Sequence, residues 1–187
     1  MDFDTVLSIC LGLGLSAACG FRVFVPLLVM SLATHAGWLE LAGGFSWIGE
    51  TPALLTFAVA TGLEIGAYYI PWLDNVLDSV ATPAAVVAGT VATASVVTGL
   101  DPALKWILAA IAGGGVAGAV QTATVGGRMV SSLATAGLGN PLLATLEWLG
   151  SLLLSLMSIL LPVLAACLVL LWLVLVWRRR RRTATVT

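Results

Sequence analysis

The residue best placed to do chemistry in this chain is Arg22, which lies within an apolar run at residues 6–32. If that run crosses a bilayer, its guanidinium costs about 2.5–3.5 kcal/mol on insertion scales. Intramembrane charges are usually held by a partner, and they mark functional or structural centres. The first question about this sequence is therefore which group holds Arg22.

Glu64 is the second charge inside an apolar run, at residues 51–70. Both runs lead to the same connection at residues 34–50, so antiparallel neighbours would place Arg22 and Glu64 at nearly the same depth. An ion pair is the cheapest way to keep both buried, and we expect one. Two interpretations stay open: the pair is structural, or it forms a site for an ion or a headgroup.

Polar residues around Glu64 recur at helical spacing. They would share one face if the helix continued past the proline. Asp74 adds a further acid beside this face. The pattern predicts an access path that leads from Glu64 to the membrane surface. Such an acidic face can also attract cations or meet Arg22 and Arg128, and Asp74 and Asp78 also suit a solvated loop. The residues at this spacing are Thr61, Glu64, Tyr68, Pro71, Asn75 and Asp78.

Prolines and glycines predict where helices break. Pro26 lies one turn after Arg22, so the first helix is expected to be discontinuous at its charge, as in many transporters. A glycine run before the hydrogen-bonding side chain of Gln121 suits close helix packing, or alternatively a break that frees carbonyls. Kinks or breaks are expected at Pro26, Pro71, Gly113, Gly114, Gly115 and Pro162.

The composition places these residues in a membrane. The chain has 187 residues, of which 60% are hydrophobic and only 9% are charged. Soluble domains carry roughly 25% charged residues, so this chain cannot cover a water-facing surface. We predict an all-α, polytopic helical bundle that forms one transmembrane domain at residues 1–177. No catalytic set, metal-ligand spacing or cofactor motif can be assembled, and nothing indicates nucleic-acid binding.

Five spans are predicted, with six as the alternative. The first four cover residues 6–32, 51–70, 83–100 and 103–125, with Asp101 as a helix cap and a glycine break after residue 125. The last apolar run, residues 142–177, would be about 54 Å long as one helix, against a hydrocarbon core of about 30 Å. We favour an interfacial helix at 142–150 followed by one span kinked at Pro162, over two spans that turn near Pro162.

A basic tail at residues 178–187 sets the orientation. Five arginines at the end of a span place the C-terminus of this multi-pass chain in the cytoplasm. They would also bind anionic lipid. These residues are Arg178, Arg179, Arg180, Arg181 and Arg182.

Two motifs resemble the signatures of a bacterial membrane-protein family, domain of unknown function 4126. The first is Gly-Leu-Ser-Ala-Ala-Cys-Gly-Phe-Arg-Val-Phe-Val-Pro-Leu at residues 14–27. The second runs from Glu64 through Pro71 to Asp78, and Asn140-Pro141 with Glu147 and the segment around Pro162 is similar to the C-terminal part. The resemblance covers nearly the whole chain. It implies a small polytopic inner-membrane protein and supplies no activity.

The leading hypothesis is a small transporter or channel-like permease. An anionic solute or lipid headgroup would compete with Glu64 for Arg22, or a proton on Glu64 would open the pair. A single short chain makes a thin pathway, so a homo-oligomer is expected. The alternative is a non-transporting scaffold or regulatory subunit. An enzyme acting on lipid is the weakest option, because only Asp74 and Asp78 cluster at one interface.

Overall fold

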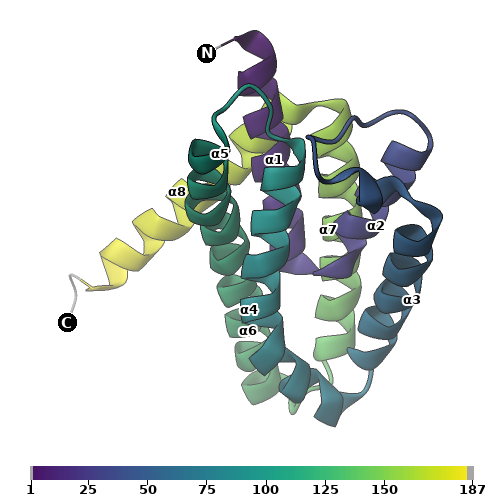
Figure 1. The fold of residues 1–187 in the computed structure, drawn as a ribbon. Helices are drawn as coiled ribbons and strands as arrows, with labels where there is room; N and C mark the ends of the chain where they lie inside the picture. Colours follow the sequence, from purple (N-terminus) through teal and green to yellow (C-terminus); the bar gives the residue numbers. More distant parts are fainter. Residues whose placement is uncertain (1, 185–187) are drawn as a thin grey trace.

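The computed structural model describes residues 2–184, together with their side chains except those of residues 71–76 and 179–184. The described chain is helical and contains no strand, so the predicted helical bundle is confirmed (Figure 1). Its helices are α1 (Phe3–Phe21), α2 (Phe24–His35), η1 (Ser46–Gly49), α3 (Thr51–Ala67), α4 (Pro71–Val96), α5 (Pro102–Leu108), η2 (Ala109–Gly114), α6 (Gly115–Thr135), α7 (Asn140–Leu160) and α8 (Pro162–Ala184).

Helix α1 lies at the centre and packs against α4, α6, α7 and α8. Small residues cover it on several sides, which lets the neighbouring backbones approach closely. A Cβ atom on Gly20, for example, would lie 2.5 Å from the carbonyl oxygen of Ala117 on α6. The buried small residues of α1 include Gly12, Gly14, Ser16, Ala17, Ala18 and Gly20.

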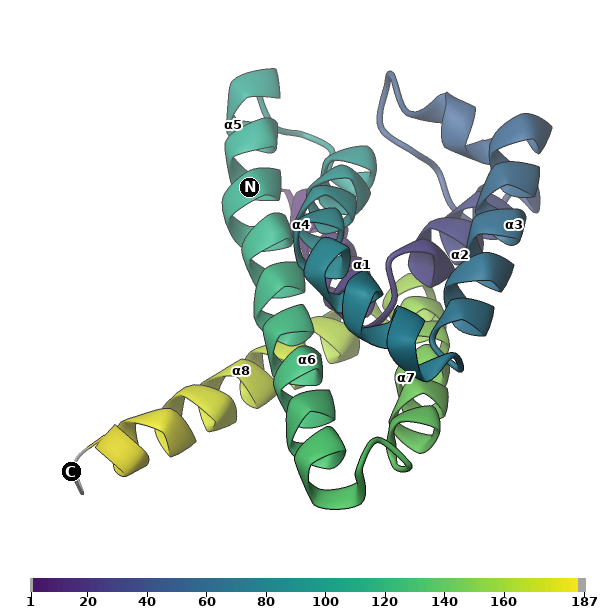
Figure 2. The ribbon, with the colours of Figure 1, turned by 90° about the horizontal axis from the view of Figure 1, so that it is seen from below.

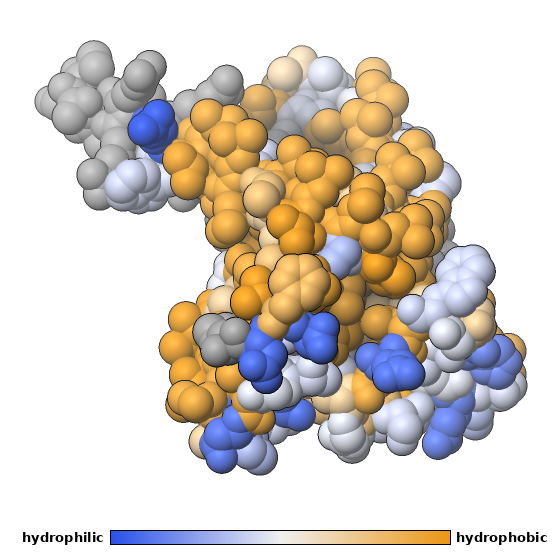
Figure 3. Space-filling view, turned by 90° about the horizontal axis from the view of Figure 1, so that it is seen from above, coloured by the Kyte–Doolittle hydropathy of each residue, from blue (hydrophilic) through white to orange (hydrophobic). Residues whose placement is uncertain are grey.

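Several helices are apolar enough for a membrane. Four of the described helical segments are long and apolar enough to cross one: Phe3–Phe21, Leu77–Val96, Pro102–Thr135 and Asn140–Leu160. Three apolar helices are shorter: Phe24–His35, Thr51–Ala67 and Pro162–Arg178. Seen from the end where the chain begins, hydrophilic residues gather over one part of the surface and hydrophobic residues cover the rest (Figure 3). The chain is thus a multi-pass helical membrane protein.

The first predicted span is two helices. Helix α1 ends at Phe21, and Arg22 takes an extended conformation with φ −146° and ψ 129°. Helix α2 then runs from the end of α1 toward α3, as Figures 1 and 2 show. Pro26 lies in the first turn of α2, where a missing N–H costs little. The predicted discontinuity at the charge is confirmed, but residues 6–32 do not form a single straight span.

Helix α4 begins at Pro71, twelve residues before the start predicted for the third span. Helix α3 ends at Ala67 and Pro71 begins the next helix after a turn, so a break rather than a kink lies here, one of the two outcomes expected for Pro71. The predicted spans left residues 74–82 as a connection between helices, and this is wrong, because these residues belong to α4. Pro83 lies inside the helix rather than at its start.

The fourth predicted span is longer than expected. Asp101 caps its start as predicted, since its Oδ1 accepts a hydrogen bond from the N–H of Ala103 at 2.9 Å. The helix then changes to π-helical hydrogen bonding at Ala109–Gly114 and continues to Thr135. A Cβ atom on Gly113 would lie 2.8 Å from the carbonyl oxygen of Gly89, so the glycine run serves close packing. The predicted break after residue 125 is wrong, because α6 passes through it.

The last apolar run turns at Leu161. Helix α7 is continuous from Asn140 to Leu160, so the predicted interfacial helix at 142–150 is wrong. Pro162 starts α8 instead of kinking one span, which is the alternative interpretation. Proline disfavours the helical region for the residue before it, and Leu161 has φ −139° and ψ 64°. Arg178 is exposed near the end of α8, while the side chains of Arg179, Arg180, Arg181 and Arg182 lie outside the described residues.

Candidate functional site

Arg22 is buried where α1 ends, with 1% of its surface exposed. Its Nη2 donates to Glu147 Oε2 at 2.9 Å and to the carbonyl oxygen of Ala144 at 3.2 Å. Both partners lie on α7, far along the sequence. The break after Phe21 makes this possible, because an extended residue 22 lets the guanidinium reach past the end of α1.

Glu147 joins Arg22 to a second buried arginine, Arg128 on α6. The Nε of Arg128 donates to Glu147 Oε1 at 3.1 Å, and its Nη2 lies 3.1 Å from Oε2. Its Nη1 donates to Asp78 Oδ1 on α4 at 2.6 Å. Each of these charges is expensive to bury alone, and charge-assisted hydrogen bonds to an opposite charge offset that cost.

Tyr68 completes this arrangement from the end of α3. Its ring centroid lies 3.7 Å from the guanidinium carbon of Arg22 and 4.4 Å from that of Arg128. Only 4% of Tyr68 is exposed. A ring at these distances attracts both cations electrostatically. We call Arg22, Tyr68, Asp78, Arg128 and Glu147 the charge cluster. Its members come from the α1–α2 break, α3, α4, α6 and α7.

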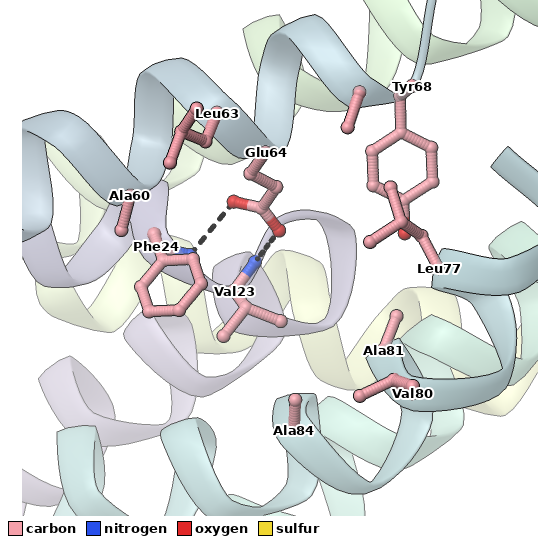
Figure 4. A pocket seen from close by; sticks show the side chains of 11 residues that line it. Val23, Phe24, Ala60, Leu63, Glu64, Tyr68, Leu77, Val80, Ala81 and Ala84 are labelled. Atoms are coloured by element: carbon pink, nitrogen blue, oxygen red, sulfur yellow. Dashed lines mark hydrogen bonds between the residues drawn. The ribbon is translucent and has the colours of Figure 1, made fainter. Parts of the chain in front are cut away.

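Glu64 does not form the predicted ion pair with Arg22. Its two carboxylate oxygens accept hydrogen bonds from the N–H groups of Val23 at 2.7 Å and Phe24 at 3.0 Å (Figure 4). Glu64 does lie at nearly the same depth as Arg22, as predicted, since its carboxylate contacts the residues that follow Arg22. The break, however, exposes the first N–H groups of α2 to Glu64 and turns the guanidinium toward α7. A carboxylate is favoured there by the positive end of the helix dipole.

The other predicted site residues have mixed outcomes. Tyr68 and Asp78 belong to the charge cluster, so the solvated-loop interpretation of Asp78 is wrong. The continuous polar face is also wrong, because α3 ends at Ala67 and a turn separates it from α4. The side chains of Asp74 and Asn75 lie outside the described residues. Gln121 is buried on α6, and its Nε2 has no hydrogen-bond partner among the described residues.

The role of Glu147 was not predicted, because Glu147 falls in the segment expected at the membrane interface. A contact between the acidic face and Arg128 was one of the outcomes considered, and the Arg128–Asp78 pair is that contact. The pairing of Arg128 with Glu147 was not expected. A signal for Glu147 was present, because the buried residues of α7 recur three or four positions apart and are small or polar. Such a face indicates a helix whose polar side is turned into the protein. These residues are Asn140, Ala144, Glu147, Ser151, Ser155 and Ser158.

Three hollows flank the charge cluster. One of about 330 Å³ lies between α3 and α4, with Glu64 and Tyr68 in its wall. A second of about 370 Å³ is lined by Asp78 and Arg128, and a third of about 270 Å³ by Glu147. Within the described residues, no group of three or more His, Cys, Asp or Glu side chains could hold a metal ion. The charge cluster is held together by ion pairs and charge-assisted hydrogen bonds.

Residues 9–182 match the family described as Domain of unknown function (DUF4126). This confirms the resemblance indicated by the sequence motifs. No curated protein and no solved structure matches the chain.

Proposed function

We propose that this chain, which belongs to the DUF4126 family, is a small permease with the charge cluster as its binding centre. The observation that carries the proposal is the position of the cluster. Two buried arginines and their acids lie at the end of a discontinuous helix, and hollows flank them on three sides. Transporters commonly place substrate and ion sites at such breaks.

The cost of the cluster supports a functional role. Apolar replacements of a buried ion pair are often neutral or stabilising, so stability alone does not explain why charges occupy this position. Elsewhere this bundle joins its helices with neutral groups, as between Ser16 and the carbonyl oxygen of Gly89. Charged side chains occur instead at the break between α1 and α2, where the first N–H groups of α2 lack main-chain partners.

The proposed substrate is a small ion, an anionic solute or a lipid headgroup. Arg22 supports this, because its Nε and Nη1 have no hydrogen-bond partner among the described residues. A guanidinium with free donors can accept a second anion beside Glu147. Movement of a proton onto an acid of the cluster would loosen the ion pairs and release that anion.

The proposed location is the bacterial inner membrane, with the C-terminus in the cytoplasm. The arginines of the tail favour the cytoplasmic side. Exposed acids lie where α1, α3 and α5 begin and in the connection after α2. They are Asp2, Asp4, Glu40, Glu50 and Asp101. The proposed working unit is a homo-oligomer, since one chain of this size makes a thin pathway.

The second candidate is a non-transporting scaffold or regulatory subunit. One observation favours it: Glu147 and Asp78 both pair with Arg128, so the cluster joins α4, α6 and α7 as a structural cross-link would. Under this function the cluster has no need to open.

Flux in proteoliposomes separates the two. Purified protein is tested with potassium, chloride, phosphate and acetate, and a pH-sensitive dye reports protons. The Arg22→Gln, Glu147→Gln double variant removes one cation and one anion and leaves the Arg128–Asp78 pair. The matched control is Asp101→Asn, Lys105→Gln, which removes the same charges at the start of α5. We expect flux of at least one probe that the control retains and the cluster variant loses. The permease proposal is contradicted if the wild-type protein gives no more flux than protein-free vesicles. It is also contradicted if the cluster variant and the control variant give equal flux.

A further inference from the structure

The hollow between α3 and α4 is an apolar pocket of about 330 Å³, within the range of small-molecule sites. Figure 2 shows α3 and α4 diverging from the turn that joins them. Two lining residues, Leu63 and Val80, are 69% and 61% exposed, so the pocket opens toward the lipid-facing surface. Its apolar walls include Ala60, Leu63, Leu77, Val80, Ala81 and Ala84 (Figure 4).

At the inner end of this pocket, two N–H groups bind a carboxylate, and this carboxylate is the side chain of Glu64. Val23 and Phe24 line the pocket, and their N–H groups hold the two oxygens of Glu64. A helix N-terminus with two aligned N–H donors suits a carboxylate. In this structure Glu64 takes the place that an acid group entering from the pocket would take.

A second, independent observation points to a bound anion. Arg22 adjoins Val23, is 1% exposed, and has two donors, Nε and Nη1, without a partner among the described residues. Its guanidinium lies over the ring of Tyr68, which is itself part of the pocket wall. Arg22 does not itself line the pocket, but its neighbour Val23 and the wall residue Tyr68 place these buried donors beside the pocket's inner end. Buried donors without acceptors are costly.

We propose that the pocket binds a membrane-partitioning monocarboxylic acid, with its apolar chain between α3 and α4 and its carboxylate on the N–H groups of Val23 and Phe24. The proposal rests on the permease function and deepens it, because it names the substrate class. The N–H groups of Val23 and Phe24 select the acid end of the ligand, and the apolar walls select its chain.

The exchange can occur without adding charge to the site. Inside a bilayer the acid is neutral, because an unpaired carboxylate is costly there. On entry, the ligand's carboxyl O–H bond breaks and an O–H bond forms on the Glu64 carboxylate, so the proton moves from ligand to Glu64. The ligand, now the carboxylate, takes over the two N–H donors. One carboxylate and one carboxylic acid are present before and after. An alcohol or an amine of the same chain length cannot make this exchange.

Photolabelling in lipid nanodiscs tests the proposal. The probe is a twelve-carbon carboxylic acid with a diazirine in its chain, and the matched probe carries an alcohol in place of the acid. We expect the acid probe to label residues 60–68 and 77–84 of the wild-type protein, and unlabelled dodecanoate to compete. The alcohol probe should show no preference for these segments. Equal labelling by both probes, or acid labelling without competition, overturns the proposal.

Two variants locate the site. Ala60→Phe fills the pocket, while Val59→Phe adds the same bulk to the neighbouring position, which is 63% exposed and outside the pocket lining. Glu64→Gln removes the proton acceptor.

We expect acid labelling to fall about tenfold in Ala60→Phe and in Glu64→Gln and to persist in Val59→Phe. Labelling that survives both substitutions contradicts the site. If a variant does not fold, the wild-type comparison of acid and alcohol still decides.

The two proposals fail separately. Flux of an inorganic ion that the charge-cluster variant loses, without preferential acid labelling, leaves the permease standing and rejects this substrate class. Preferential acid labelling without flux of any probe, dodecanoate included, keeps the binding site and rejects transport.

Discussion

Helix α1 makes two kinds of polar contact, and they differ in cost. Along its length, Ser16 donates to the carbonyl oxygen of Gly89 at 2.7 Å and lies 2.9 Å from the hydroxyl of Thr93, which donates to Gly12 at 3.1 Å. We call these four residues the hydroxyl layer. At the end of α1, the charge cluster connects the helices through guanidinium and carboxylate groups instead.

The difference shows what the broken helix requires. Within the hydroxyl layer, main-chain carbonyls already bonded inside their helices accept an additional hydrogen bond from a neutral side chain. At the break, the first N–H groups of α2 lack main-chain partners, and Glu64 and the charge cluster gather around them. The hydroxyl layer holds helices together, whereas the charge cluster also concentrates groups that a ligand or a proton can rearrange.

The largest effect should follow from Glu147→Ala. The substitution removes the carboxylate that both Arg22 and Arg128 contact, and it leaves two buried cations without it. We expect a loss of about 3–5 kcal/mol in the free energy of unfolding, measured by denaturation in detergent micelles. Glu40→Ala, in the exposed connection, is the control and should change little. A loss below about 1 kcal/mol for Glu147→Ala would mean that Asp78 and Tyr68 hold the two cations without Glu147.

Gly89→Ala should have the next largest effect, in the hydroxyl layer. The new Cβ atom would lie 2.5 Å from that of Ala117 and 3.0 Å from the hydroxyl of Ser16. Overpacking of this kind costs about 1–3 kcal/mol of unfolding free energy. Gly62→Ala on α3 is the matched control, because nothing lies within 4 Å of its new Cβ atom. Equal stability of the two variants would show that α4 is not closely packed against α6 and α1 at Gly89.

The smallest effect belongs to Ser16→Ala. It removes a hydroxyl but leaves the carbonyl oxygen of Gly89 near its own helix partners. Hydrogen bonds between membrane helices contribute about 0.6 kcal/mol on average. The same detergent denaturation should therefore give a change near that value, and none for Thr122→Val, whose exposed hydroxyl bonds only within α6. A change as large as that of Glu147→Ala would remove the distinction between the two regions.

Local signals in the sequence predicted much of the fold. The cap at Asp101 and the break near Arg22 depend on neighbouring residues, and both are confirmed. The start of α4 was misplaced because Pro83 looked like a helix start, whereas packing accommodates it within the helix. Proline and glycine indicate that a helix can break, but they do not decide whether it does.

The partners in the site could not be predicted in the same way. The prediction of an Arg22–Glu64 pair assumed two straight, antiparallel helices. It is wrong because the extended backbone at Arg22 turns the side chain toward α7. Its partner Glu147 is 125 positions away, where nothing local identifies it as an acid for Arg22. The polar face of α7 indicated that Glu147 is buried, but not which cation it meets.

The most direct test of the central claim compares two buried aromatic side chains by hydroxyl-radical footprinting in lipid nanodiscs. Tyr68 in the charge cluster is 4% exposed, and Phe57 in the apolar core is 8% exposed. If the charge cluster is a site that water and ligand reach, Tyr68 should be modified at a rate close to that of exposed Tyr69, while Phe57 stays protected. Protection of Tyr68 equal to that of Phe57 would mean that the cluster is a closed structural lock, and it would contradict the account.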